Sequence, residues 1–357
     1  MHNSLLCFAF SALLMGSIKA QSPDSTMVCE NNCCCAIAVP TPAGLMYSHV
    51  HSKGEWMISY RLMNMGMEGL RSGTSTISNN DVFNQYLMSP KNMQSNMHML
   101  MAMYGVNSRL TLMLMANYIS NSMEMLMFPG SGMNMPGMTV SPTESASTSV
   151  SSGFGDFKVH ALYHLLSSKK HQLILSAGVN IPTGNIHYLG ASDDMMYSHK
   201  RMPYSMQLGS GSFDALPAIG YSYRKEELAA GVQLSGVYRI YHNQLGYRLG
   251  NEATANLWFA YRWLKLWSSS LRIETGMNDK IQGNDPLLYY YYEPSANPNN
   301  YGGQRTLLYM GTTVQINKGF LKNNKIGAEY GFPLYQRVNG IQAPVKSMIN
   351  VYWSLNF

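Results

Sequence analysis

Apolar and polar residues alternate along most of this chain, in runs of about ten residues. The last residues show this clearly, with Ile349, Val351 and Trp353 on one side and Asn350 and Ser354 on the other. Such alternation indicates β-strands with one apolar face, and a tilted strand that crosses a membrane needs roughly 9–11 residues. The pattern therefore predicts an all-β fold, an antiparallel transmembrane outer-membrane β-barrel of about 12 strands. We expect these strands at 54–66, 96–106, 109–119, 154–166, 171–181, 211–224, 228–241, 252–264, 267–280, 304–317, 324–332 and 346–357.

The connections between the predicted strands are alternately short and long. The short ones are expected at 107–108, 167–170, 225–227, 264–267 and 317–323, and the long ones at 67–95, 120–153, 182–210, 242–251, 278–303 and 333–345. Outer-membrane barrels have short periplasmic turns and long extracellular loops. We therefore expect a protein of the outer membrane of a Gram-negative bacterium, in contact with its lipid. The barrel-assembly machinery is a further expected partner, through the C-terminal strand that ends at Phe357.

The beginning of the chain predicts export from the cytoplasm. An apolar run at residues 3–15 is followed by small residues near Ala20, as in a secretory signal. We expect a signal peptide at 1–20, a periplasmic segment with Cys, His and Met at 21–53, and the barrel at 54–357. Charged residues make up 12% of the chain, about half the share usual in soluble domains. No later apolar run reaches the roughly 18 residues of a spanning helix, and the net charge of +6 is too dispersed to indicate nucleic acid.

Methionine is concentrated in one stretch of the chain, because 19 of the 29 methionines lie between Met46 and Met138. In the first three predicted strands they fall opposite the leucines, on the face that carries Glu55 and Arg61, so we expect them to line the lumen. The candidate soft-metal ligands among them are Met63, Met65, Met67, Met97, Met99, Met101, Met103, Met113 and Met115. Thioether sulfur prefers soft ions such as Cu(I) and Ag(I). Successive weak sites of this kind would let an ion enter and leave.

Further soft ligands precede the first predicted strand. They are Cys29, Cys33, Cys34, Cys35, His49 and His51. Thiol, imidazole and thioether groups together predict Cu(I) binding, the one cofactor that the chain suggests. The alternative for the cysteines is a disulfide, because the periplasm is oxidising, although three consecutive cysteines cannot easily pair with one another.

The methionines also have a simpler interpretation, because methionine is a flexible residue that fills irregular gaps. A lumen lined by it would be plugged, or would offer an adaptable path to small hydrophobic or phenolic compounds. A third hypothesis is an outer-membrane lipid or ester hydrolase. The chain has no His-Glu-x-x-His motif, phosphate-binding glycine loop or nucleophile elbow. We therefore expect no enzyme and no catalytic residues.

Seven sequence blocks resemble a known family. They are Gly54 to Arg61, Met97 to Met99, Arg109 to Met113, Gly153 to Asp156, Ile181 to Gly184, Pro203 to Gly211 and Asn339 to Gln342. Their order and spacing over residues 46–357 are similar to the outer-membrane barrels grouped with the MetA-pathway phenol-degradation family, which are transporter-like. The resemblance implies a barrel in the outer membrane, and for the methionine-rich type an association with copper. It transfers no binding residues, so the favoured hypothesis is a transporter-like barrel that binds or passes Cu(I) or Ag(I).

Overall fold

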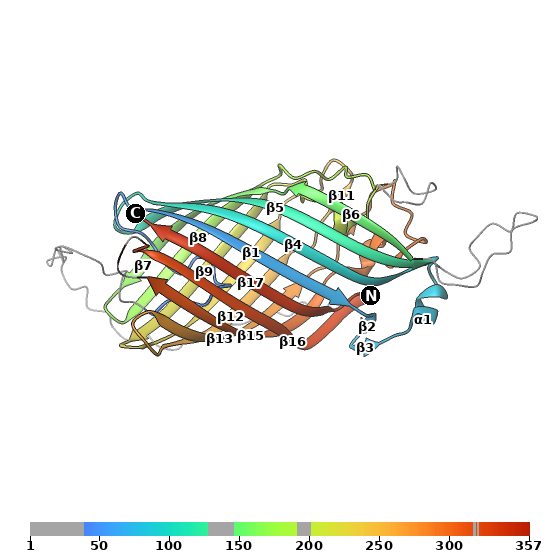
Figure 1. Cartoon of the computed structure of the whole chain (residues 1–357). Helices are drawn as coiled ribbons and strands as arrows, with labels where there is room; N and C mark the ends of the chain where they lie inside the picture. Colours follow the sequence, from blue (N-terminus) through green and yellow to red (C-terminus); the bar gives the residue numbers. More distant parts are fainter. Residues whose placement is uncertain (1–38, 128–145, 191–200, 317–318, 320) are drawn as a thin grey trace, which may run out of the picture. The chain divides into compact units, whose positions relative to one another are not determined.

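Twelve long strands form a closed antiparallel barrel in the computed structural model, which describes residues 39–127, 146–190, 201–316, 319 and 321–357 (Figure 1). The strands are β1 (Trp56–Glu68), β4 (Met88–Gly105), β5 (Leu110–Met127), β7 (Phe157–Ser167), β8 (His171–Ile181), β9 (Asp214–Lys225), β10 (Leu228–Arg239), β12 (Glu252–Arg262), β13 (Trp267–Asn278), β15 (Gly303–Ile316), β16 (Asn324–Gln342) and β17 (Val345–Asn356). Each pairs with its neighbours along the chain, and β1 pairs with β17 to close the ring. Closure leaves no strand edge exposed to lipid.

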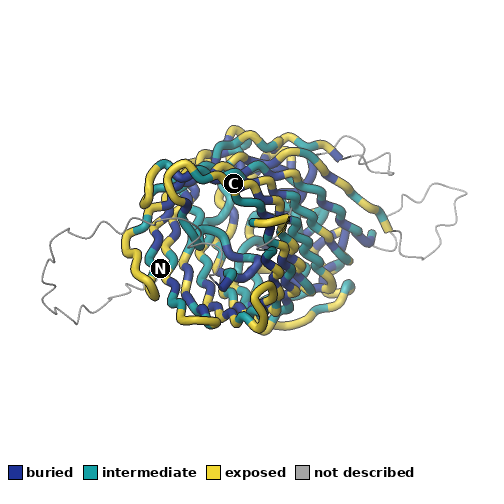
Figure 2. The backbone as a smooth tube through the Cα atoms, turned by 60° about the vertical axis from the view of Figure 1, so that its left-hand side comes forward, coloured by how far each residue is buried: buried dark blue, intermediate teal, exposed yellow. Residues whose placement is uncertain are grey.

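The alternation in the sequence becomes an inner and an outer face. In β12, Leu257 is 57% exposed whereas its neighbour Trp258 is 4% exposed. Figure 2 shows exposed and buried residues alternating along the strands. The outer face is rich in leucine, isoleucine, valine and aromatic side chains, as a surface in contact with hydrocarbon requires. Within the described residues, no helix is long and apolar enough to cross a membrane.

All twelve predicted strands are present, and β8 has the predicted bounds. Three strands are longer than predicted, because β4 begins at Met88, β5 extends to Met127 and β16 extends to Gln342. The predicted loops 67–95, 120–153 and 333–345 are therefore partly wrong. These extensions lie toward the loop end of the barrel, where polar residues such as Asn92 and Glu124 pair across strands. In β4 and β5 the extended parts lack an apolar outer face, which is the signal on which the prediction depends. In β16 the adjacent residues Leu334 and Tyr335 are both exposed, so the alternation is interrupted there.

Short strands and helices lie at the end of the barrel opposite the C-terminus. Strand β6 (Ala146–Phe154) adds to the extended part of β5, in a region predicted to be loop. The other short elements are β2 (Arg71–Gly73), β3 (Ser75–Thr76), α1 (Asn79–Phe83), η1 (Tyr204–Met206), β11 (Tyr247–Arg248), β14 (Gln282–Gly283), η2 (Pro294–Ala296) and η3 (Pro298–Asn300). We call this end the loop end and the other, where the short connections and Phe357 lie, the turn end (Figure 1).

Residues 39–53, which we call the luminal segment, contain no strand and lie against the inner wall of the barrel. The sequence predicts that residues 21–53 form a periplasmic segment. Of these, residues 21–38 lie outside the described residues, as does the predicted signal peptide at 1–20, whereas residues 39–53 contact the barrel wall. Val39 and Leu45 bury their side chains against Trp258, which points inward from β12. The apolar contact removes both side chains from water. The segment therefore enters the lumen before the chain turns into β1.

Candidate functional site

The predicted inward methionines of β4 and β5 pack together inside the barrel toward the turn end. We call this group the turn-end cluster, and its buried methionines are Met57, Met99, Met101, Met103, Met113 and Met115. Each of them is 1–5% exposed. Leu162 and Ile174, from β7 and β8, complete it, and Met63 and Met97 pack against its edge. Side chains so closely packed fill this part of the lumen.

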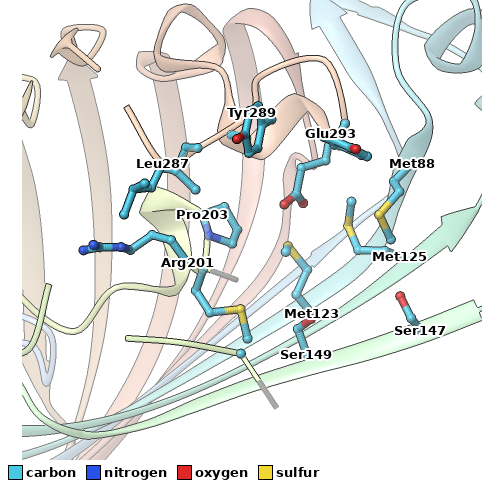
Figure 3. A pocket seen from close by; sticks show the side chains of 15 residues that line it. Met88, Met123, Met125, Ser147, Ser149, Arg201, Pro203, Leu287, Tyr289 and Glu293 are labelled. Atoms are coloured by element: carbon cyan, nitrogen blue, oxygen red, sulfur yellow. The ribbon is translucent and has the colours of Figure 1, made fainter. Parts of the chain in front are cut away.

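A second group of methionines lies toward the loop end. This loop-end cluster consists of Met88, Met93, Met123, Met125, Met202 and Met206. None of the six is among the nine candidate methionines named from the sequence, although Met123 and Met125 belong to a methionine-rich stretch in which the sequence also suggests soft ligands. Four of them, Met88, Met123, Met125 and Met202, line a small cavity together with Tyr289 and Glu293 (Figure 3). The loop residues Met202 and Met206 join methionines from the strands β4 and β5, which the sequence separates from them by many residues.

Three predicted methionines of β1 connect the two clusters. Met67 packs against the loop-end cluster, and Met63 packs against the turn-end cluster. Both also pack, together with Met65, against a third group formed by Leu307, Tyr309, Val345 and Met348. Thioether contacts therefore continue along one wall of the lumen, from the loops to the luminal segment.

The luminal segment is held by polar side chains of the inner wall. The backbone N–H of Gly44 donates to Glu329 Oε2 at 2.8 Å, and that of His51 donates to Thr111 Oγ1 at 2.8 Å. The Tyr47 hydroxyl lies 3.3 Å from His160 Nε2. Burial raises the pKa of Tyr47 to about 12, so its hydroxyl stays protonated at neutral pH. The bonds from Gly44 and His51 satisfy two backbone N–H groups of the luminal segment, which forms no strand pairing inside the barrel.

A cavity of about 70 Å³ separates the luminal segment from the barrel wall. Methionines of the turn-end cluster form one side of it, and polar residues that include Arg61, Lys325 and Tyr352 form another. Arg61 is 7% exposed, and its Nη2 donates to the Leu45 carbonyl oxygen at 3.2 Å. Its Nε and Nη1 have no hydrogen-bond partner among the described residues. The guanidinium is thus only partly satisfied.

Arg272, a second buried arginine nearby, is by contrast well paired. It contacts Glu329 at 2.9 Å and Glu274 at 2.6 Å, and donates to Asn256 at 2.7 Å. Its guanidinium carbon lies 3.7 Å from the centre of the Tyr309 ring. This network also holds the luminal segment in place, because Glu329 Oε2 accepts a hydrogen bond from the backbone N–H of Gly44 as well. We assign it a structural role.

The two candidate histidines of the luminal segment lie side by side, with ring centres 5.0 Å apart. The Nε2 atoms of His49 and His51 are buried and have no partner among the described residues. Burial lowers the pKa of both histidines, that of His49 the more strongly, so both rings are neutral at pH 7. A neutral imidazole nitrogen is a metal ligand. No group of three or more His, Cys, Asp or Glu side chains in the described part of the chain could hold a metal ion.

The four candidate cysteines, Cys29, Cys33, Cys34 and Cys35, lie outside the described residues. The structure therefore brings together the predicted methionines of β1, β4 and β5 and places His49 and His51 in the same lumen. The assignment of any of these residues as metal ligands stays a prediction.

Sequence reasoning missed a buried polar network at the loop end of the wall. Asp156 accepts from Asn180, Ser210 and the backbone of Gly184, at 2.8–2.9 Å. Asn180 also donates to Asp214, which forms a buried ion pair with Arg239. Three of the blocks that resemble the family, around Asp156, Gly184 and Ser210, thus meet in space. The network attaches the connection between β8 and β9 to the wall.

A closed antiparallel barrel with an apolar outer face defines this chain as a Gram-negative outer-membrane protein. The structure is similar to the crystal structure of the COG4313 outer membrane channel from Pseudomonas putida F1. The TM-score is 0.55, the sequence identity is 13%, and the similarity covers 86% of this chain and 97% of that one. The P. putida toluene transporter TodX matches with a TM-score of 0.40 and 9% identity, over 86% of this chain and 90% of that one.

At 13% identity the similarity to the COG4313 channel shows a shared fold and no more. A scan against protein-family models and a search of curated proteins each find no match. The barrel fold and outer-membrane location implied by the family resemblance are confirmed. The copper association that the resemblance implies has no support in these comparisons.

Proposed function

We propose that this protein is an outer-membrane channel for small hydrophobic or phenolic compounds. The observation that carries the proposal is the continuous methionine surface along the lumen, from the loop-end cluster through Met63, Met65 and Met67 to the turn-end cluster. Methionine side chains are apolar and adaptable, so they can rearrange around solutes of different shape. The similarity to a barrel described as an outer membrane channel agrees with this proposal at the level of the fold.

The packed lumen implies that passage requires movement of side chains and of the luminal segment. The luminal segment is held by hydrogen bonds to the wall and by the burial of Val39 and Leu45 against Trp258, and the cavity beneath it shows that the packing there is incomplete. A segment held in this way can be displaced without unfolding the barrel, because the strands pair with one another and not with it. We infer that the luminal segment controls passage at the turn end.

Uptake of radiolabelled p-cresol by intact Gram-negative cells that express the protein tests the proposal. We expect uptake above that of cells without the protein, and a several-fold loss for Met63→Asn, which places an amide on the wall between the two clusters. Met277→Asn is the matched control, because Met277 is 52% exposed on β13. Equal uptake with and without the protein, or equal loss in the two variants, would contradict the proposal.

Binding or passage of Cu(I) or Ag(I) is a second candidate function. It is favoured by the continuous thioethers and by the unpartnered Nε2 atoms of His49 and His51. Replacing Met97, Met99, Met101 and Met103 by Leu keeps the apolar bulk and removes the sulfur. If the lumen handles soft metal, this variant should lose binding of Cu(I) in a reducing titration with a competing chelator.

The same four substitutions separate the two candidates, because a hydrophobic lining should tolerate them and keep p-cresol uptake. A variant without residues 21–45 locates any metal bound by the wild type. Binding that persists after this truncation would lie in the barrel, and binding lost with it would depend on the N-terminal cysteines. Absence of binding by the wild type would reject the metal hypothesis.

A further inference from the structure

We propose that the cavity beneath the luminal segment binds a small aromatic carboxylate, with its carboxylate on Arg61 and its ring against the turn-end methionines. The inference rests on the proposed function, since it takes the lumen as the path of the solute. It adds a charge requirement that a purely hydrophobic channel would not have. Its basis is the combination, in one cavity, of an unpaired buried cation and an apolar wall.

The charge of Arg61 is the first part of the argument. Arg61 is 7% exposed, yet Nε and Nη1 have no partner among the described residues, and Nη2 donates to the neutral carbonyl of Leu45. Leaving a buried guanidinium without an anion is unfavourable, because the ion has lost its hydration. Nη1 lies at the outer end of the planar guanidinium, where it can donate a charge-assisted hydrogen bond to an oxygen of a carboxylate.

The neighbouring carboxylate does not fill this role. Glu329 forms its ion pair with Arg272 and also accepts from the Gly44 backbone. Within the described residues, Arg61 has no ion pair with any Asp or Glu side chain. With Glu329 already engaged by Arg272 and Gly44, the guanidinium of Arg61 favours an anion from outside the chain.

The opposite wall of the cavity determines what kind of anion fits. Met57, Met101, Met103 and Met113 face it with thioethers and methylenes. An inorganic anion would leave this surface without an apolar partner, whereas a ring would cover it. A cavity of about 70 Å³ holds a few water molecules, since one water needs roughly 10–15 Å³ of such volume. One small ring with a carboxylate replaces those waters.

Titration calorimetry on the full chain, folded in detergent, tests the site with benzoate as the probe. We expect benzoate to bind at least about tenfold more tightly than p-cresol, which has the ring without the charge, and than acetate, which has the charge without the ring. Arg61→Gln should weaken benzoate binding by about tenfold or more, since it removes the cation but keeps a side chain of similar length. Arg305→Gln is the matched control, because it removes another arginine from the barrel strands without altering this cavity.

Unchanged benzoate affinity in a folded Arg61→Gln variant would overturn the proposal. So would equal binding of acetate and benzoate, or displacement of benzoate by chloride at equal concentration, because the site would then recognise charge alone. If Arg61→Gln does not fold, as judged by heat-modifiable migration in gels, the comparison of benzoate, p-cresol and acetate on the wild type decides. Normal p-cresol uptake without benzoate binding rejects this inference alone, whereas benzoate binding without p-cresol uptake rejects the channel function alone.

Discussion

Glu293 shows how a single loop residue couples the loop end to pH. It lines the loop-end cavity with Met88 and Met125, and the Ser295 hydroxyl donates to its carboxylate at 2.6 Å. Removal from water raises the pKa of Glu293 above its ordinary value of 4.5. Below pH 4.5 the side chain is neutral in the folded and the unfolded protein. As the pH rises through the folded-state pKa the carboxyl ionises in a poorly hydrated site, so stability is lost.

We therefore expect Glu293→Gln to stabilise the barrel at pH 7, by roughly 1–3 kcal/mol, and to have little effect at pH 4. The measurement is the free energy of unfolding in denaturant at the two pH values. Glu227→Gln is the control, since Glu227 is exposed in the turn between β9 and β10 and its 3.4 Å contact with Arg262 lies at the surface. An equal gain at both pH values would show that the effect of Glu293→Gln does not come from ionisation.

We expect the luminal segment to be the element that most directly determines whether the lumen is open. Gly44 lies where the segment approaches the Arg272–Glu329 pair, and a Cβ atom at this position would overlap with both side chains. Gly44→Ala should therefore loosen the segment, and the mean conductance of the protein in a planar bilayer should rise by about twofold or more. Gly220→Ala is the matched control, because a Cβ there meets nothing closer than 3.8 Å. Equal conductance in the two variants would mean that the segment does not obstruct the lumen.

The same element shows the limit of what the sequence could predict. Alternation located all twelve strands because the membrane imposes one apolar face on each of them. It also assigned the methionines of β4 and β5 to the inner face. The luminal segment contains Pro40, Pro42 and Gly44 and has no periodicity, so nothing in it indicates a wall partner. Its contacts with Trp258 and Glu329 arise from closure of the barrel, which brings strands distant in the chain around it.

Contacts that join distant parts of the chain explain the remaining omissions. Asp156, Asn180 and Ser210 belong to separate segments, and none of them carries a local motif that points to the others. Asp156, Gly184 and Ser210 each lie in a block that resembles the family. This indicates that the three blocks matter, but it does not predict the hydrogen bonds between them. Likewise, the loop-end cluster needs Met202 and Met206, which the sequence places in a long connection without periodicity.

At the scale of the whole molecule, the barrel depends on an uninterrupted apolar belt around its outside. Leu257 lies at the middle of β12 and is 57% exposed, so it should contact hydrocarbon near the centre of the bilayer. Leu264 is 64% exposed in the turn between β12 and β13, at the rim of the barrel. The two leucines are similarly exposed and differ in depth. A buried charge costs most where the membrane is least hydrated.

We therefore expect Leu257→Lys to reduce the free energy of unfolding in lipid vesicles by about 2–4 kcal/mol, and Leu264→Lys by roughly 0–1 kcal/mol. Urea titration of the vesicle-inserted protein, followed by tryptophan fluorescence, measures both. Equal losses would contradict the depth that the structure assigns to β12. In a detergent micelle, whose apolar region is thinner and more adaptable than a bilayer, the difference between the two variants should be smaller. Because the inner wall is untouched, p-cresol uptake per folded molecule should stay the same in both, which separates the membrane-facing surface from the path of the solute.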